Sequence, residues 1–178
     1  MSSDDPLDHD EHDHHDHGDH EGHDHGHEPA GVSDEQHRAL AVGLFNDVWE
    51  LLGTPDRTRE LDGQMLHAAH ASRFHWGMVG GPQQWAVGEW QCSRVYAVLG
   101  RGEPALHHAR ESLLICEETG LGDWVLAAAY EALARASGVA GDASGQASWL
   151  AKARQAVLAI ADAEDREVIE ADLATLEA

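Results

Sequence analysis

The chain has 178 residues, and with 33 acidic against 11 basic side chains its formal net charge at pH 7 is −22. This charge opposes binding to phosphate backbones and to anionic lipid, so we expect neither nucleic acid nor a membrane as a partner. The sequence has no run of about 18 apolar residues and no basic, then apolar, N-terminal segment, which indicates a soluble, cytoplasmic protein. All basic residues but Lys152 are arginines, and with abundant Ala and Gly this hints at a bacterial source with a GC-rich genome.

Residues 1–28 differ in composition from the rest of the chain. They contain nine histidines and eleven acidic residues, but no Lys or Arg. Leu7 is their only large aliphatic side chain beyond Met1, so they cannot bury enough apolar surface to offset the entropy of ordering. We therefore expect residues 1–32 to be a disordered His/Asp-rich tail and residues 33–178 to form a folded domain.

The tail histidines are candidate metal ligands. They are His9, His12, His14, His15, His17, His20, His23, His25 and His27. Histidines so closely spaced on a flexible chain can surround one ion, and the interleaved carboxylates attract a dication; Zn, Ni and Cu suit such ligands best. In composition the tail resembles the His-rich segments of nickel chaperones and zinc transporters. The alternatives are an expression tag or a solvated acidic segment that keeps the protein soluble.

From Ser33 onward the apolar residues recur at helical spacing. Ser33, with Gln36 three residues later, has the pattern of a helix start, and Thr58 begins the next helix. No segment alternates as a strand does, so the pattern predicts an all-α fold of about seven helices. The expected helices are 33–53, 58–79, 82–99, 104–119, 124–139, 144–160 and 164–176.

The second of these helices carries three histidines. His67 and His70 share a stripe with Phe74 and Met78, and His75 flanks it. A second stripe, from Leu61 through Met65, Ala68, Ser72 and Trp76 to Val79, lies on the other side. This leaves only a narrow outward strip that includes Arg73. We therefore expect this helix to be covered on two faces, with buried imidazoles that need partners.

Glu89 stands in the middle of the inner stripe of the third helix and is the natural partner for those histidines. One hypothesis is a metal site in which His67 and His70 share an ion with Glu89, His75 or His108. The second is a hydrogen-bonded polar core in which Glu89 pairs with a histidine or with Arg94, because a buried carboxylate left alone is costly. The third is a pocket for a non-metal ligand or for acid–base chemistry.

The sequence gives little support for nucleophilic catalysis, and we assign no catalytic residue. Cys92 shares a stripe with Glu89, which raises the pKa of a thiol, and neither Cys92 nor Cys116 is expected in a disulfide. Ala105, Ala109, Ser112 and Cys116 form a stripe of small residues that lets another helix approach closely. Glu131 and Arg135 are spaced for an ion pair within one helix.

A pattern of glycine and small residues occurs in two segments. Tyr96, Leu99 and Gly100 are followed by Ala105 and Ala109, and this segment resembles a tetratricopeptide repeat; Ala134, Gly141 and Ala153 give a weaker second copy. The two glycines are 41 residues apart, against a family period of about 34. The resemblance implies antiparallel helical hairpins stacked as a short right-handed solenoid, with a concave groove that binds a protein or peptide. The candidate groove residues are Trp85, Tyr96, Trp124, Glu131 and Arg135.

These observations lead to one main functional hypothesis and one alternative. The main hypothesis is a cytoplasmic tetratricopeptide-like adaptor or scaffold whose tail binds divalent transition-metal ions, in metal handling or with a metalloprotein partner. The alternative is a metalloenzyme or metal sensor that uses His67, His70 and Glu89.

Overall fold

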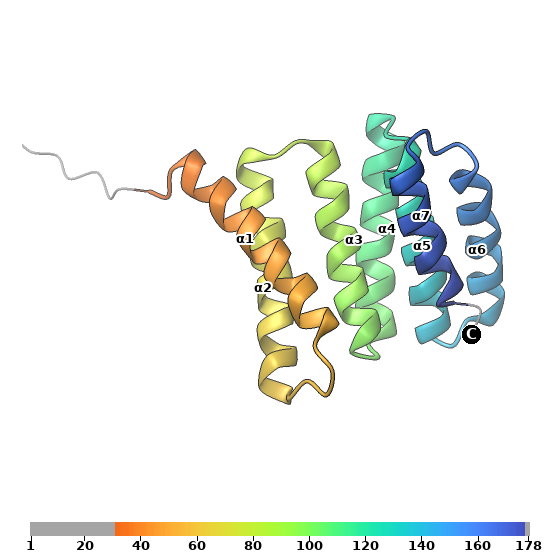
Figure 1. Cartoon of the computed structure of the whole chain (residues 1–178), viewed down its shortest axis with the longest axis horizontal. Helices are drawn as coiled ribbons and strands as arrows, with labels where there is room; N and C mark the ends of the chain where they lie inside the picture. The colour runs from red at the N-terminus through yellow and green to blue at the C-terminus, as the bar shows by residue number, and fades with distance from the viewer. Residues whose placement is uncertain (1–30, 177–178) are drawn as a thin grey trace, which may run out of the picture. The chain divides into compact units, whose positions relative to one another are not determined.

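The computed structural model describes residues 31–176, and within this range all regular structure is helical (Figure 1). The predicted all-α fold is confirmed for these residues, whereas the predicted tail and its nine histidines lie outside them, apart from residues 31 and 32. The helices are α1 (Asp34–Gly53), α2 (Arg59–Val79), α3 (Pro82–Val98), α4 (Gly102–Thr119), α5 (Asp123–Val139), α6 (Ala143–Val157) and α7 (Ala163–Ala174).

The helix starts follow from local side-chain caps. The Ser33 hydroxyl accepts a hydrogen bond from the Gln36 backbone N–H, and the Gln36 side chain accepts one from the Ser33 N–H, so the predicted capping box is present. The Thr58 hydroxyl caps α2 in the same sense by accepting from the Leu61 N–H. The expected boundaries hold to within about two residues, except that α6 ends three residues before Ile160.

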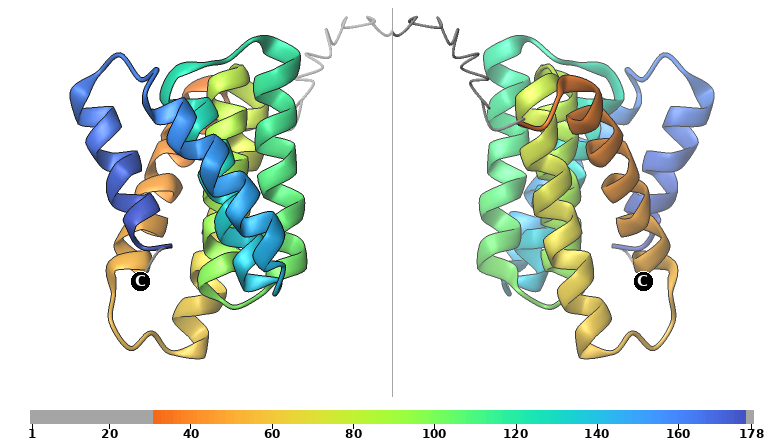
Figure 2. Two further views of the ribbon diagram at one scale, coloured as in Figure 1. Left: turned by 90° about the vertical axis from the view of Figure 1, so that its right-hand side faces the viewer. Right: turned by 90° about the vertical axis from the view of Figure 1, so that its left-hand side faces the viewer.

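The helices pack as consecutive pairs. The most extensive contacts are α1 with α2, α3 with α4, and α5 with α6, and α7 packs against α5 and α6. Neighbouring pairs meet through α2 with α3 and α4 with α5, and α3 also contacts α5. The two views of Figure 2 place α1 and α7 toward one side of the stack and α4 toward the other, with α3 and α5 between them. The described residues therefore form stacked helical hairpins followed by a last single helix.

Small residues bring α3 and α4 close together, as the sequence predicts. Ala105, Ala109, Ser112 and Cys116 are all at most 1% exposed. The Ser112 hydroxyl donates to the backbone carbonyl of Ala86 at 2.9 Å, which requires the two helices to lie nearly in backbone contact. The largest core cluster spans α3 to α7, and a smaller one around Val48 and Met65 joins α1, α2 and α3.

The prediction that α2 is covered on two faces is wrong. Met65, Ala69 and Ser72 are buried, but Phe74 is 61% exposed and Met78 is 58% exposed, and His67 is exposed as well. Among the described residues the extensive contacts of α2 are with α1 and α3. The stripe of His67, Phe74 and Met78 therefore lies on the free side of the first hairpin.

None of the helices in residues 31–176 combines the length and apolar character that crossing a membrane requires.

Candidate functional site

Five polar or ionisable side chains from three successive helices meet between α2, α3 and α4. His70 and Arg73 come from α2, Glu89 and Tyr96 from α3, and His108 from α4. We call this group the histidine–glutamate cluster. It brings together four of the residues that the sequence singled out, namely His70, Glu89, Tyr96 and His108. It adds Arg73, which the pattern placed on the outward strip of its helix.

Glu89 is the centre of the cluster. Its Oε1 accepts a hydrogen bond from Arg73 Nε at 2.8 Å, and its Oε2 accepts one from His108 Nδ1 at 2.6 Å. Burial alone raises the pKa of Glu89, but the hydrogen bond from His108 and the positive charge of Arg73 outweigh it and hold this pKa below its usual value. The carboxylate therefore stays ionised and fixes the proton of His108 on Nδ1.

His70 and Tyr96 complete the cluster on the side of His108. His70 Nε2 lies 2.9 Å from the Tyr96 hydroxyl, and the Tyr96 ring stacks on the His108 ring with centroids 5.4 Å apart. Burial, together with the nearby His108, lowers the pKa of His70 below its usual value, against the opposing charge of Glu89. These surroundings therefore favour the neutral form of the His70 imidazole.

A glycine makes room for the Arg73 side chain. A Cβ added at Gly88 would lie 2.6 Å from Arg73 Cδ, far inside van der Waals contact. The missing side chain lets the arginine run along α3 to the neighbouring Glu89. The sequence shows Gly88 next to Glu89, but only the packing of α2 on α3 shows why it is small.

The structure separates two of the histidines that the metal hypothesis joined. His67 is exposed, and His75 lies by His37 instead of Glu89. Within residues 31–176 no group of three or more His, Cys, Asp or Glu side chains is placed to hold a metal ion. Glu89 instead has the hydrogen-bonded arrangement of the second hypothesis, although its partners are His108 and Arg73 and not Arg94.

His37 and His75 form a pair that the sequence analysis missed. His37 is 8% exposed, and its Nδ1 lies 2.7 Å from His75 Nδ1, with ring centroids 4.9 Å apart. His37 stands in the first turn of α1, where most neighbours are polar, and nothing in its local pattern marks it as buried. Only the antiparallel packing of α1 and α2 brings it to His75.

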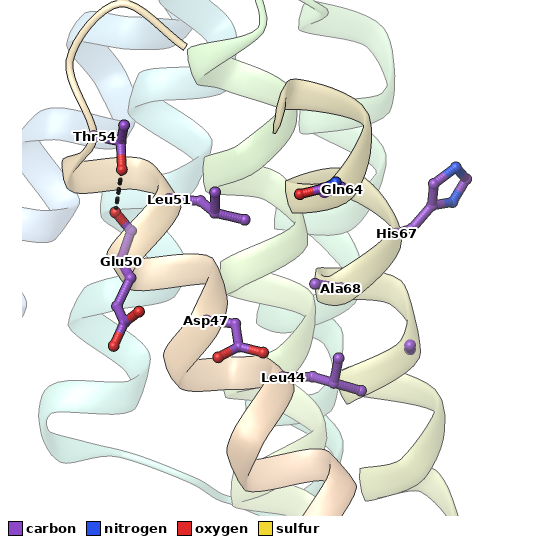
Figure 3. A pocket seen from close by; sticks show the side chains of 9 residues that line it. Leu44, Asp47, Glu50, Leu51, Thr54, Gln64, His67 and Ala68 are labelled. Carbon is purple, nitrogen blue, oxygen red and sulfur yellow. Dashed lines mark hydrogen bonds between the residues drawn. The ribbon is translucent and has the colours of Figure 1, made fainter. Parts of the chain in front are cut away.

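An open groove of about 650 Å³ lies between α1 and α2 (Figure 3). Figure 3 shows Leu44 and Leu51 pointing across toward α2, while the His67 ring projects outward. Apolar and acidic side chains share the lining, which consists of Leu44, Asp47, Glu50, Leu51, Thr54, Gln64, His67, Ala68 and Ala71.

A smaller and more apolar pocket of about 180 Å³ lies where α1, the end of α2 and the starts of α3 and α5 meet. We call it the tryptophan pocket, and it is lined by Val42, Phe45, Trp76, Gln83, Gln84, Val87 and Trp124. Of the five candidate groove residues, Trp124 lies here. Trp85 supports the wall, because its indole N–H donates to the Trp76 carbonyl at 3.0 Å.

The remaining candidate groove residues serve other contacts. Tyr96 belongs to the histidine–glutamate cluster. Glu131 is 1% exposed and accepts from Arg135 Nε at 2.7 Å, so the predicted pair within α5 is confirmed, although it is buried. Arg94 adds a second ion pair to Glu131, and Asp172 of α7 pairs with Arg94 in turn. Both arginines donate to Oε1 of Glu131, and the indole N–H of Trp90 donates to Oε2, so this network joins the helices and leaves no carboxylate oxygen of Glu131 free.

Searches of this chain against protein-family models, curated proteins and solved structures find no match.

Proposed function

We propose that residues 33–178 are a cytoplasmic protein-binding module of the tetratricopeptide type, and that the preceding tail binds divalent Zn, Ni or Cu ions. The module would hold an apolar segment of a partner protein in the tryptophan pocket. The biological role that combines protein binding with metal binding is metal handling, or action as an adaptor for a metalloprotein.

The hairpin turns support the tetratricopeptide assignment. Gly100 and Gly141, which carry the sequence resemblance, have φ of 70° and 81° and stand at equivalent places after α3 and α5. Each is followed by a helix that folds back on its predecessor. A side chain strains this backbone conformation, so a glycine at both turns agrees with a repeated hairpin.

The tryptophan pocket is the observation that carries the binding function. Two indoles, a phenyl ring and two valines line a concave apolar surface, while Gln83 and Gln84 border it with amide groups. Ligand sites combine these features: apolar walls supply affinity and a few polar groups fix orientation. Val42 is 44% exposed at this pocket, so an apolar side chain from a partner can cover it.

Charge indicates the character of the partner. Residues 29–178 carry 33 − 11 = 22 acidic residues and all 11 basic ones, a net of −11. A basic segment with a bulky apolar residue is therefore favoured over an acidic one, both in its rate of encounter and in its specificity.

Selection of peptides from a displayed random library on the full chain tests the binding function. We expect enrichment of peptides with a large apolar residue flanked by basic ones. Val42→Asp should weaken their binding at least tenfold. Val139→Asp, at a valine that is 39% exposed and not among the pocket residues, is the matched control and should not. Failure to enrich any peptide, or equal binding by the two variants, would reject the tryptophan pocket as the site.

The metal activity has a separate test. Zn, Ni and Cu titrations of the full chain are compared with those of a variant whose nine tail histidines are all asparagine. We expect the full chain to bind several more ions than the variant does. Equal numbers of bound ions in the two proteins would remove the tail from the proposal.

A further inference from the structure

The His37–His75 pair lies at the open end of the first hairpin, opposite its turn. Three hydrogen bonds of side chains join α1 and α2 there. The Ser72 hydroxyl donates to the Ala41 carbonyl at 2.8 Å, His75 meets His37, and Arg38 donates to the Val79 carbonyl at 3.3 Å. The outer contacts hold the two backbones in place, so the imidazoles between them are preorganised.

The two Nδ1 atoms point at each other and must share one proton. At 2.7 Å one nitrogen donates a proton and the other accepts it, because two bare lone pairs or two N–H groups would repel at this distance. A metal cation can take the place of that proton. Each neutral ring then binds the ion through Nδ1 and carries its hydrogen on Nε2, so no net proton is released.

We propose that His37 and His75 bind one transition-metal dication through their Nδ1 atoms. The ion links the start of α1 to the end of α2. This site lies in the helical domain, and it goes beyond the metal binding proposed for the tail because it needs no tail residue.

The geometry needs only a small adjustment. Zn–N bonds of about 2.0–2.1 Å in a tetrahedral site place two ligand nitrogens roughly 3.3 Å apart, so the pair must open by about 0.6 Å. The Phe74 ring packs edge-on against the half-buried His75 ring, with centroids 5.4 Å apart, but Phe74 is 61% exposed, so both rings can shift toward solvent while the buried His37 stays fixed.

The ligand set determines which ions fit. Two imidazoles favour Zn, Ni or Cu over Ca and Mg, which prefer oxygen ligands. Within residues 31–176 no third His, Cys, Asp or Glu completes a set of three. Water therefore fills the other positions, and the ion is exchangeable. An exchangeable ion suits the uptake or transfer of metal and not a permanent structural role.

The experiment uses the full chain with its nine tail histidines replaced by asparagine, so that only the helical domain can bind through histidine. Cu titration followed by electron paramagnetic resonance should show one ion per chain with hyperfine splitting from two imidazole nitrogens. Zn should raise the melting temperature in proportion to the logarithm of its concentration once the site is saturated. Mg should not.

Variants identify the ligands. His37→Gln and His75→Gln, made in this tail-substituted chain, should each weaken Cu and Zn binding at least tenfold. His67→Gln, at an exposed histidine of the same helix as His75, is the matched control and should bind as the parent does. Helical circular dichroism without metal checks that each variant is folded, and a second pair, His37→Asn and His75→Asn, replaces any that is not.

Two results would overturn the site. One is a tail-substituted chain that binds no Zn, Ni or Cu. The other is binding that His67→Gln weakens as much as His37→Gln does. Neither result affects the tail or the tryptophan pocket, whose tests compare other variants.

Discussion

The guanidinium of Arg94 on α3 and the carboxylate of Glu131 on α5 form an ion pair with Nη1 and Oε1 3.1 Å apart, and this carboxylate is only 1% exposed. Arg135 and the indole N–H of Trp90 also donate to it, at 2.7 and 3.4 Å. Glu131 therefore accepts hydrogen bonds from two arginines and a tryptophan. Its removal should cost more stability than the removal of a surface carboxylate.

Glu131→Ala should lower the free energy of unfolding by about 3–5 kcal/mol, because it leaves Arg94 and Arg135 partly buried without their shared counter-charge. Glu131→Gln keeps the shape and one acceptor oxygen and should cost less. Urea unfolding followed by circular dichroism measures both. A loss of under about 1 kcal/mol for Glu131→Ala would mean that solvent screens this network as it does a surface pair.

Acid should destabilise the domain in two stages. The pKa of His70 is held below its ordinary value of 6.5, so below that pH the unfolded chain binds a proton that the folded one does not. The pKa of Glu89 is held below its ordinary 4.5, and its contribution is lost as the pH falls through the lowered value. In both ranges the unfolded state binds more protons, so stability falls with falling pH.

Free energies of unfolding measured between pH 8 and pH 4 test whether stability falls as the pH falls. His70→Gln should flatten the part of the curve just below pH 6.5. A curve that rises as the pH drops from 7 to 5.5 would contradict the lowered pKa of His70.

Both cysteines should be inert toward thiol reagents while the protein is folded. Burial raises the pKa of Cys92 to about 12, with Glu89 adding to the effect, and burial raises that of Cys116 to about 11. Their exposures of 0% and 1% also exclude the reagent. A chromogenic disulfide at pH 8 should react with neither thiol in buffer and with both in urea. Fast reaction of either one in buffer would show local opening of α3 or α4.

Gly100→Ala and Gly141→Ala should each destabilise the domain by about 1–2 kcal/mol through backbone strain. A Cβ at either position would meet nothing within 4 Å, so their positive φ is the sole cause. Gly43→Ala, inside α1 and equally free of neighbours, is the control and should stabilise by about 0.5–1 kcal/mol. Thermal unfolding of the three variants separates the two effects.

Features that depend on nearby residues were predictable from the sequence. Ser33 and Thr58 cap the helices that their positions indicated, the Glu131–Arg135 pair is set by its spacing, and the small stripe from Ala105 to Cys116 admits a close neighbour. Each follows from helical geometry alone.

Features that depend on which helices become neighbours were not predictable. Periodicity predicts two covered stripes on α2, but only the stripe of Met65 and Ser72 is buried, and of the other stripe His70 alone meets α3 and α4. The sequence pattern places Arg73 on the outward strip of its helix, but α3 packs beside it, with Gly88 at the contact. His37 has no partner among its neighbours in the sequence, and only the packing of α2 alongside α1 brings His75 to it. The composition of a helix face limits how far that face can be buried, but it does not determine which other helix packs against it.

The attachment of α7 has a consequence for local unfolding. Only Ile169 and Leu173 of this helix are buried, yet Arg135 donates to the Asp172 carbonyl and to the Thr175 hydroxyl, and Arg94 pairs with the Asp172 carboxylate. Fraying of α7 would therefore remove the ion-pair partner of Arg94 in α3 and two hydrogen-bond acceptors of Arg135 in α5. A short helix with so little apolar contact would otherwise open by itself. Here we expect its amide hydrogens to exchange with solvent only through the same opening that exposes the centre of the domain.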